Sequence, residues 1–195
     1  MNIMAHKFDP KKLAKLDSPQ RRKLLPPENS LQKLKFKSGQ KVADIGCAIG
    51  YFSIPLAELV GENGRVYGLD IVPEMLEEAR LRAGNSYSNL SFLVSDENKL
   101  PLENEEVEAV FLAALVHELE DTHDFFQEVK RILKPGGKVK IIEWKKEKMG
   151  MGPTLTDRIS QEEMIRILDK NGFEVKEQLD IGAGHYGVIA EVSAN

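Results

Sequence analysis

The sequence has little cysteine, no long apolar run and no large excess of one charge. Its single cysteine, Cys47, excludes an intramolecular disulfide and a metal site built from several cysteines. The longest apolar run, Ala109 to Val116, has eight residues, which is far short of a membrane span. Met1 to Pro10 contains no long apolar core. We therefore expect no signal peptide, no membrane span and a cytoplasmic location.

The overall charge and composition indicate an ordinary globular protein. The net charge is −4, so a nucleic-acid partner is not expected. Hydrophobic residues make up 42% of the sequence and charged residues 30%, which is typical of a soluble domain. With 195 residues, no internal repeat and no low-complexity segment, the chain is expected to form one domain.

The stretch Val42 to Gly50, VADIGCAIG, organises the rest of the chain. A short apolar strand ends in an acid, Asp44, and is followed by a turn of small residues. Apolar residues then recur at helical spacing from Tyr51 to Leu59. A strand, a glycine turn and a helix in this order expose backbone N–H groups to a ligand.

A second motif supports a nucleotide ligand. Arg65 to Asp70 reads as a short strand ending in an acid, 24 residues past Gly46. An acid at this place accepts hydrogen bonds from ribose hydroxyls. The small residues Gly46, Ala48 and Gly50 do not fit the G-x-G-x-x-G spacing of dinucleotide-binding proteins. A glycine turn without a ligand remains the competing interpretation.

Strands and helices alternate along the chain. This alternation predicts an α/β fold with a doubly wound, seven-stranded sheet. Helix starts are predicted at Ser18-Pro19, at Pro73 and at the capping box Ser160–Glu163. The expected strands are residues 42–45, 66–70, 90–94, 107–114, 138–144, 173–179 and 185–192.

The pattern D-x-G-x-A-x-G from Asp44 to Gly50 resembles the acid-x-G-x-G-x-G motif of class I S-adenosylmethionine-dependent methyltransferases, with Ala48 in place of the middle glycine. The segment LKPGGKVKIIEW also resembles this family. HELED, DRISQEE and HYGVIAE resemble its ubiquinone/menaquinone-methyltransferase-like, type 11 branch. The resemblance implies a Rossmann-like, mostly parallel sheet of order 3-2-1-4-5-7-6, whose last strand is antiparallel.

The resemblance also implies a division of the chain and a set of cofactor contacts. Residues 1–40 are expected to form an N-terminal helical lid or extension, because they precede the sheet and hold two short capped segments, and residues 41–195 the S-adenosylmethionine-binding domain. Within the N-terminal segment, Arg21, Arg22 and Lys23 either reach over the cofactor or form a solvated charged face. In the family an acid past the third strand takes the adenine amine, and Asp96 matches it; a helix cap or exposed turn is the alternative role. The expected cofactor-binding residues are Asp44, Gly46, Cys47, Ala48, Gly50, Asp70, Ile71, Asp96, Glu97 and Ala113.

Candidates for chemistry follow the fourth and fifth strands. His117 is the candidate general base, whereas hydrogen bonding to backbone or shaping of the adenine pocket is its competing role. Glu118 is equally ambiguous. Trp144 either walls the acceptor pocket or packs in the core. Arg158, His185 and Tyr186 either face the acceptor or make hydrogen bonds between strands or to solvent.

The function implied is methyl transfer from S-adenosylmethionine, with S-adenosylhomocysteine as product, to a small-molecule or lipid-like acceptor. Two other classes stay open: a catalytically silent S-adenosylmethionine-binding module and an NAD-dependent oxidoreductase. No metal is expected, and the isolation of Cys47 disfavours arsenite as acceptor. The oligomeric state is left open, with a homodimer as one candidate.

Overall fold

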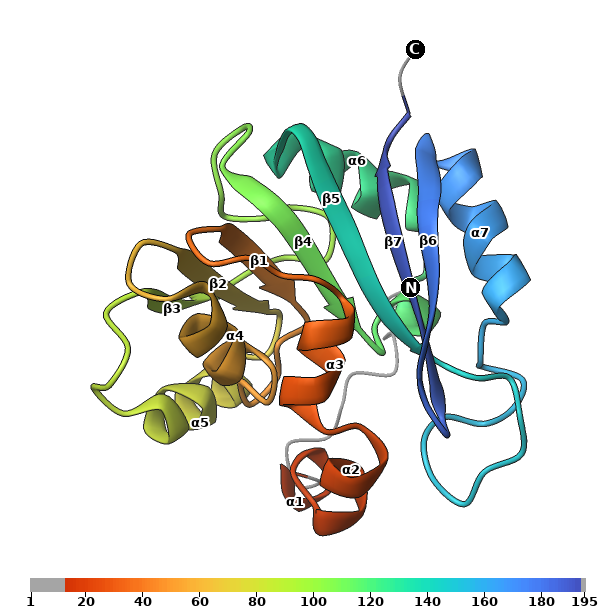
Figure 1. The fold of residues 1–195 in the computed structure, drawn as a ribbon, viewed down its shortest axis with the longest axis horizontal. Coiled ribbons are helices and arrows are strands. Elements are labelled where there is room, and N and C mark those ends of the chain that lie inside the picture. Colours follow the sequence, from red (N-terminus) through yellow and green to blue (C-terminus); the bar gives the residue numbers. More distant parts are fainter. Residues whose placement is uncertain (1–12, 194–195) are drawn as a thin grey trace, which may run out of the picture.

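A seven-stranded sheet forms the centre of the computed structural model, which describes residues 13–193. The strand order is β3-β2-β1-β4-β5-β7-β6 (Figure 1). β7 is antiparallel to both β5 and β6, and the other neighbouring strands are parallel. Both the predicted order and the antiparallel last strand are therefore confirmed. The strands are β1 Lys41–Ile45, β2 Arg65–Asp70, β3 Leu90–Val94, β4 Val107–Ala113, β5 Leu133–Trp144, β6 Phe173–Gly182 and β7 His185–Val192.

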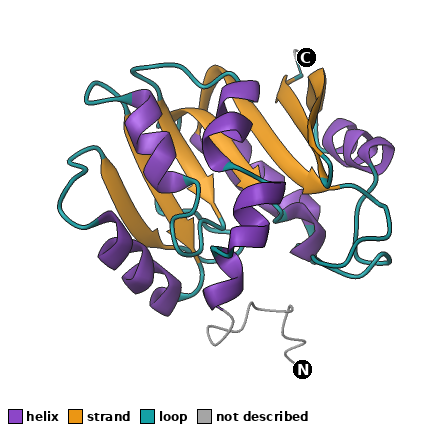
Figure 2. Ribbon diagram, turned by 60° about the horizontal axis from the view of Figure 1, so that its bottom comes forward, coloured by secondary structure: helices purple, strands orange, loops and turns teal. Residues whose placement is uncertain are grey.

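Helices cover both faces of the sheet (Figure 2). They are α1 Leu13–Leu16, α2 Pro19–Leu24, α3 Pro27–Lys33, α4 Ser53–Val60, α5 Pro73–Ala83, the short 3₁₀ turn η2 Val116–Glu118, α6 Thr122–Ile132 and α7 Gln161–Lys170. Apolar residues of α3 and α4 pack on one face, and those of α6 and α7 pack on the other. No helix in residues 13–193 is long and apolar enough to cross a membrane.

Alternating residues of the central strands fill two cores. Phe111 and Ile142 face α3 and α4, whereas Val110 and Ile141 face α6 and α7, and all four are fully buried. This alternation follows from the period of two along a strand. Because both faces are covered, the central strands read as nearly continuous apolar runs in the sequence.

Capping residues set the helix starts as predicted. The Ser18 side chain accepts from the Arg21 N–H at the start of α2, and Pro19 occupies the first helical turn. Ser160 and Glu163 form the reciprocal capping box of α7. These local interactions depend only on neighbouring residues, which is why the sequence reveals them.

Three element ends differ from the prediction. β5 begins at Leu133, whereas the strand was expected from Lys138, because Leu133 already pairs with Val107 before the register shifts. β6 continues to Gly182 through its pairing with β7. The apolar positions Leu31, Leu34 and Phe36 predict a helix from Glu28 to Phe36, but α3 ends at Lys33, because Lys35 adopts a left-handed conformation with φ 57°.

The segment before β1 divides into two parts. α3 packs in the core through Leu31 and Leu34, which are fully buried. α1 and α2 lie at the edge of the sheet where β1 and β4 end (Figure 1). The expected lid spans residues 1–40, and its first twelve residues lie outside the described part of the chain.

Candidate functional site

The turn after β1 combines three left-handed residues. Gly46, Ala48 and Gly50 have φ values of 74°, 47° and 76°. The N–H groups of Gly46 and Cys47 donate to the Leu69 carbonyl, at 2.8 and 3.0 Å, so the turn crosses the end of β2. A Cβ on Gly46 would lie 2.9 Å from Leu115, which adds a packing reason for glycine there.

Asp44 lies at the carboxyl end of β1, beneath this turn. Its side chain is buried, and Ser53 Oγ donates to Asp44 Oδ2 at 2.5 Å. Burial raises the pKa of Asp44 to about 7, helped by the charge of Asp70 and opposed by the Ser53 hydrogen bond. A cation placed beside this carboxyl group would favour its charged form.

Asp70 ends β2 and holds the turn from the other side. The N–H groups of Ala48 and Val72 donate to its two carboxylate oxygens, at 2.8 and 2.9 Å. Burial raises the pKa of Asp70, and these backbone hydrogen bonds oppose the rise. Each oxygen has a second lone pair, so the carboxylate retains the capacity to accept from two ligand hydroxyls.

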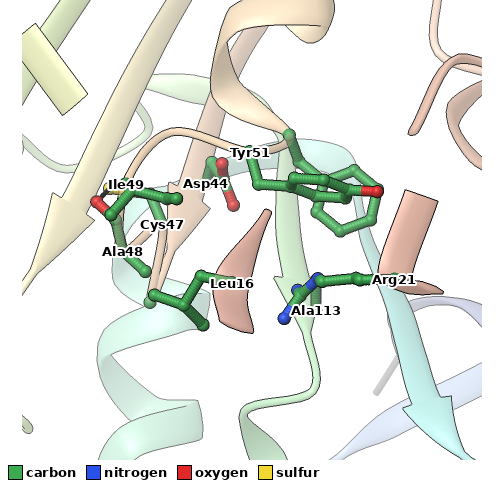
Figure 3. A pocket seen from close by; sticks show the side chains of 10 residues that line it. Leu16, Arg21, Asp44, Cys47, Ala48, Ile49, Tyr51 and Ala113 are labelled. Carbon is green, nitrogen blue, oxygen red and sulfur yellow. Dashed lines mark hydrogen bonds between the residues drawn. The ribbon is translucent and has the colours of Figure 1, made fainter. Parts of the chain in front are cut away.

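A small cavity of about 20 Å³ lies against the turn (Figure 3). This is room for about one water molecule. Of the residues expected to bind a cofactor, Asp44, Gly46, Cys47, Ala48 and Ala113 line it. The lining is completed by Leu16, Ile49, Tyr51 and Phe52, which were not expected there, and by Arg21, for which reaching over the cofactor was one of two alternatives.

The other expected cofactor residues lie outside this cavity. Ile71 follows Asp70 and is 36% exposed, which is unusual for a large apolar side chain. Asp96 is exposed beyond β3, where its N–H donates to the Lys99 carbonyl. Glu97 follows it in the same turn. A Cβ on Gly50 would contact Phe92. Their cofactor-binding roles stay predictions.

The Cys47 side chain turns away from the cavity. It packs with Leu76, Ala79 and Phe92 between the sheet and α5. Burial raises the pKa of its thiol, and the charges of Asp44 and Asp70 add to the effect. The thiolate, which is the nucleophilic form, is thereby disfavoured.

His117 is paired with a buried carboxylate. Its Nδ1 lies 3.0 Å from Glu143 Oε1, and Glu143, on β5, is fully buried. Burial alone would lower the pKa of His117, but Glu143, with Glu118 and Asp157, outweighs it and raises the pKa above the usual 6.5. Glu143 Oε2 is buried and has no hydrogen-bond partner among the described residues.

Trp144, Arg158 and Tyr186 make structural contacts. Arg158 donates to the carbonyls of Lys145, Glu147, Met151 and Pro153, so it anchors the loop after β5. Its guanidinium also lies 5.2 Å from the Trp144 ring. The Tyr186 hydroxyl donates to the Ile159 carbonyl at 3.0 Å. These hydrogen bonds go to backbone carbonyls between Lys145 and Ile159, outside the strands, and a role facing the acceptor stays a prediction for Arg158 and Tyr186.

His185 is buried without hydrogen bonds. Its ring lies 4.1 Å from that of Trp144, and neither ring nitrogen has a partner among residues 13–193. Burial lowers the pKa of His185 to about 3, and the positive charges of Arg21, Arg158 and Lys145 add to this. His185 is therefore neutral near pH 7.

Some residues of the site can be recognised from their sequence context, and others cannot. Glu143 and Lys140 are buried charged residues within the apolar strand KVKIIEW, which begins with a third charged residue, Lys138. A charge inside a buried strand indicates a specific partner. Arg21 has a weaker signal because it sits in the basic run RRK. Ser53 has none. Within the described residues, no group of three or more His, Cys, Asp or Glu side chains is arranged to hold a metal.

The fold and turn agree with known proteins. A family model described as a methyltransferase domain matches residues 36–185. A solved structure, a SAM-dependent methyltransferase from Aquifex aeolicus, superposes with a TM-score of 0.91 at 37% identity. That match covers 95% of this chain and 100% of the Aquifex chain.

Curated relatives match over shorter segments. A demethylmenaquinone methyltransferase from Lactobacillus johnsonii is 33% identical over 114 residues, which are 57% of this chain and 47% of that protein. An arsenite methyltransferase from Halobacterium salinarum is 34% identical over 104 residues, 53% of this chain and 27% of that protein. The chain thus spans about half or less of the length of these relatives.

Ala48 provides a test of strain in the turn. A left-handed conformation costs a non-glycine residue about 1–2 kcal/mol, and the greater freedom of glycine in the unfolded chain offsets about half of the gain from relieving it. We expect Ala48→Gly to stabilise the protein by about 0.5–1 kcal/mol, raising Tm by roughly 2–3 °C. The measurement is thermal unfolding without ligand. Gly50→Ala, the opposite change at φ 76°, is expected to lower Tm. If the Tm of Ala48→Gly is equal to or below that of wild type, Ala48 is not strained.

The lowered pKa of the buried His185 predicts that the free energy of unfolding falls in acid. Its folded pKa of about 3 lies below the 6.5 of the free side chain, so the unfolded chain binds the proton more tightly between these values. Stability therefore falls as pH drops through this window, by at most about 1.4 kcal/mol per pH unit from this residue. His185→Phe keeps a ring beside Trp144 and removes the titration. Urea unfolding at pH 7, 6 and 5 should show the variant gaining on wild type as pH falls; a constant difference contradicts the prediction.

Proposed function

The chain belongs to the class I S-adenosylmethionine-dependent methyltransferases, in their type 11 branch, and on this basis we propose that it transfers the methyl group of S-adenosylmethionine to a small-molecule acceptor. The observation that carries the proposal is the turn held between two acidic strand ends, Asp44 and Asp70. Carboxylate oxygens that can accept from ribose hydroxyls lie there beside a second acid, whereas the N–H groups of Gly46, Cys47 and Ala48 already donate within the protein.

The residues at the turn fit the parts of S-adenosylmethionine. Asp70 retains acceptor capacity for the two ribose hydroxyls, beyond its bonds to Ala48 and Val72. Asp44 suits the positively charged methionine end. The exposed apolar side chain of Ile71, directly after Asp70, suits the adenine face, and Asp96 its amine.

When bound, S-adenosylmethionine supplies a methyl group on a sulfonium, already activated for in-line displacement. The task of the protein is then to align the acceptor with this methyl group, which in model systems is worth roughly 7–11 kcal/mol. The sheet edge suits this task because β1, β4 and β5 carry the surrounding residues on rigid strands.

The cavity is too small for this cofactor as the residues now lie. Its volume is about 20 Å³, and Leu16 and Arg21 from α1 and α2 form part of its wall. We infer that α1 and α2 move aside for entry and then cover the cofactor. This role is the lid expected for the N-terminal segment.

His117 is proposed as the base for an acceptor that must lose a proton. Glu143 accepts from the Nδ1 side of the ring at 3.0 Å, which leaves the Nε2 lone pair of the neutral ring to take the proton. Glu143 acts through His117, so it is a positioning residue. Because the His117 pKa is raised, the base form is populated only as the pH rises.

A quinone-type acceptor is favoured within the small-molecule class. The name of the Lactobacillus johnsonii relative states demethylmenaquinone as its substrate. An arsenite acceptor, named for the Halobacterium salinarum relative, suits this chain less well. Thiols bind arsenite, and the single cysteine, Cys47, is buried with a raised pKa. The net charge of −4 disfavours nucleic-acid acceptors.

Ligand-induced stabilisation tests the cofactor. We expect S-adenosylhomocysteine to raise Tm, by an amount equivalent to about 2.7 kcal/mol at 100 times its Kd, whereas NAD and ATP leave Tm unchanged. Asp70→Asn should weaken S-adenosylhomocysteine binding about tenfold or more, because hydrogen bonds to a charged group contribute roughly 1.5–3 kcal/mol. Titration calorimetry measures the affinity.

Glu174→Gln, at the start of β6 and the opposite edge of the sheet, is the matched control and should bind like wild type. Stabilisation by NAD equal to that by S-adenosylhomocysteine would contradict the proposal. Binding of S-adenosylhomocysteine without methyl transfer to any acceptor would support a silent binding module.

His117 and Glu143 are tested by the pH dependence of single-turnover methyl transfer to a demethylmenaquinol analogue. His117→Ala should lower the rate roughly 10²-fold, while S-adenosylhomocysteine affinity stays near wild type. Glu143→Gln removes the negative charge that raises the His117 pKa. The pH at which the rate rises should therefore shift to lower values. If His117→Ala weakens cofactor binding as Asp70→Asn does, His117 belongs to the cofactor pocket and is no base.

A further inference from the structure

Arg21 of α2 is a cation in the wall of the pocket, and its Nε atom has no hydrogen-bond partner among residues 13–193. Its side chain extends from α2 into the space that Asp44 and Tyr51 also border (Figure 3). Arg21 Nε is fully buried, and no described residue accepts a hydrogen bond from it. A buried N–H donor without a partner is costly, so a ligand atom that accepts from Arg21 Nε would relieve this penalty.

Neighbouring acids do not neutralise Arg21. Asp17, one turn earlier in the chain, pairs instead with Arg22 at 2.5 Å and with Arg82 at 2.7 Å. Asp44, across the cavity, is occupied by Ser53. The guanidinium of Arg21 is therefore available for an anion from outside the described chain.

An aromatic ring holds the guanidinium in place. Arg21 Cζ lies 4.8 Å from the centre of the Tyr51 ring, and the Tyr51 hydroxyl donates to the Leu25 carbonyl at 2.8 Å, which fixes the ring. An arginine that stacks on a ring keeps its N–H groups free in the plane of the guanidinium. Such a plane suits two parallel hydrogen bonds to one carboxylate.

The cavity thus carries opposite charges on two walls, Asp44 from β1 and Arg21 from α2. This arrangement is complementary to an α-amino acid group, whose ammonium and carboxylate are separated by one carbon. S-adenosylmethionine ends in such a group. A plain nucleotide or NAD has no α-amino acid group, so the presence of Arg21 opposite Asp44 favours S-adenosylmethionine over these ligands.

We propose that Arg21 binds the α-carboxylate of the methionine part of S-adenosylmethionine, and that this ion pair draws α2 onto the bound cofactor. The proposal rests on the proposed function and adds a binding residue from the N-terminal segment. The fold thereby couples cofactor capture to closure, because the group that recognises the ligand sits on the moving element.

Titration calorimetry with two ligands tests the proposal. S-adenosylhomocysteine carries the carboxylate, whereas 5′-methylthioadenosine shares the nucleoside and thioether and lacks the amino acid. Arg21→Gln should weaken S-adenosylhomocysteine binding about 10- to 100-fold and leave 5′-methylthioadenosine binding unchanged. Arg22→Gln removes a charge from the same helix, where Arg22 pairs with Asp17, and should affect neither ligand.

Equal losses for both ligands, or no loss for either, would overturn the assignment. Wild-type protein that binds neither ligand would instead refute the proposed function itself. If Arg21→Gln does not fold, Arg21→Lys and an S-adenosylhomocysteine analogue with an amide in place of the carboxylate carry the test. Wild type should bind the amide at least tenfold more weakly, and Arg21→Lys should reduce that preference; equal affinity of wild type for acid and amide overturns the proposal.

Discussion

The Asp70 carboxylate joins the end of β2 to the turn after β1 by accepting from Ala48 and Val72. The rest of the site depends on this link. It holds the turn across the sheet edge, where the N–H groups of Gly46 and Cys47 bond to the Leu69 carbonyl. It also forces Ala48 into a left-handed conformation that glycine would adopt without strain. The hydrogen bond from Ala48 to the buried Asp70 carboxylate thus stabilises a left-handed conformation that the middle glycine of the family motif would adopt without strain.

The acidic residues and the basic residue of the site belong to different parts of the fold. The acids Asp44 and Asp70 belong to the sheet, and burial raises the pKa of both. The cation Arg21 belongs to α2, outside the sheet. The charged forms of Asp44 and Asp70 repel each other, so a positively charged ligand beside them would reduce this repulsion and stabilise the folded protein. A ligand with charges of both signs would also bridge the sheet and the N-terminal helices, which a purely cationic ligand would not.

The sequence predicts the parts of the fold and site that local rules determine. The strand order is implied by the family resemblance, whereas the turn after β1 follows from a motif, Asp44 to Gly50, in which all residues are near in sequence. The Ser18 and Ser160 caps follow for the same reason. Contacts between distant segments are different: Glu143 meets His117 across 26 positions, and Arg21 reaches Tyr51 only because α2 folds over the sheet edge. Nothing near Arg21 in the sequence distinguishes it from Arg22, whose side chain pairs with Asp17. The early start of β5 at Leu133 likewise depends on a partner strand.

Two strands, β5 and β7, each carry a buried side chain with polar atoms that have no hydrogen-bond partner among residues 13–193. Glu143 Oε2 and the His185 ring nitrogens are buried in neighbouring positions of β5 and β7, on opposite faces of the sheet. Each such group costs about 1–3 kcal/mol when it loses water without gaining a partner. The cofactor turn, by contrast, satisfies its groups through backbone hydrogen bonds. These bonds hold the turn after β1 in place before any ligand binds. The interaction with His117 offsets part of the cost of burying Glu143, because a fully buried carboxylate interacts more strongly with a histidine than one in water would. That strength is what allows one side chain on β5 to set the proton affinity of a ring in the loop after β4.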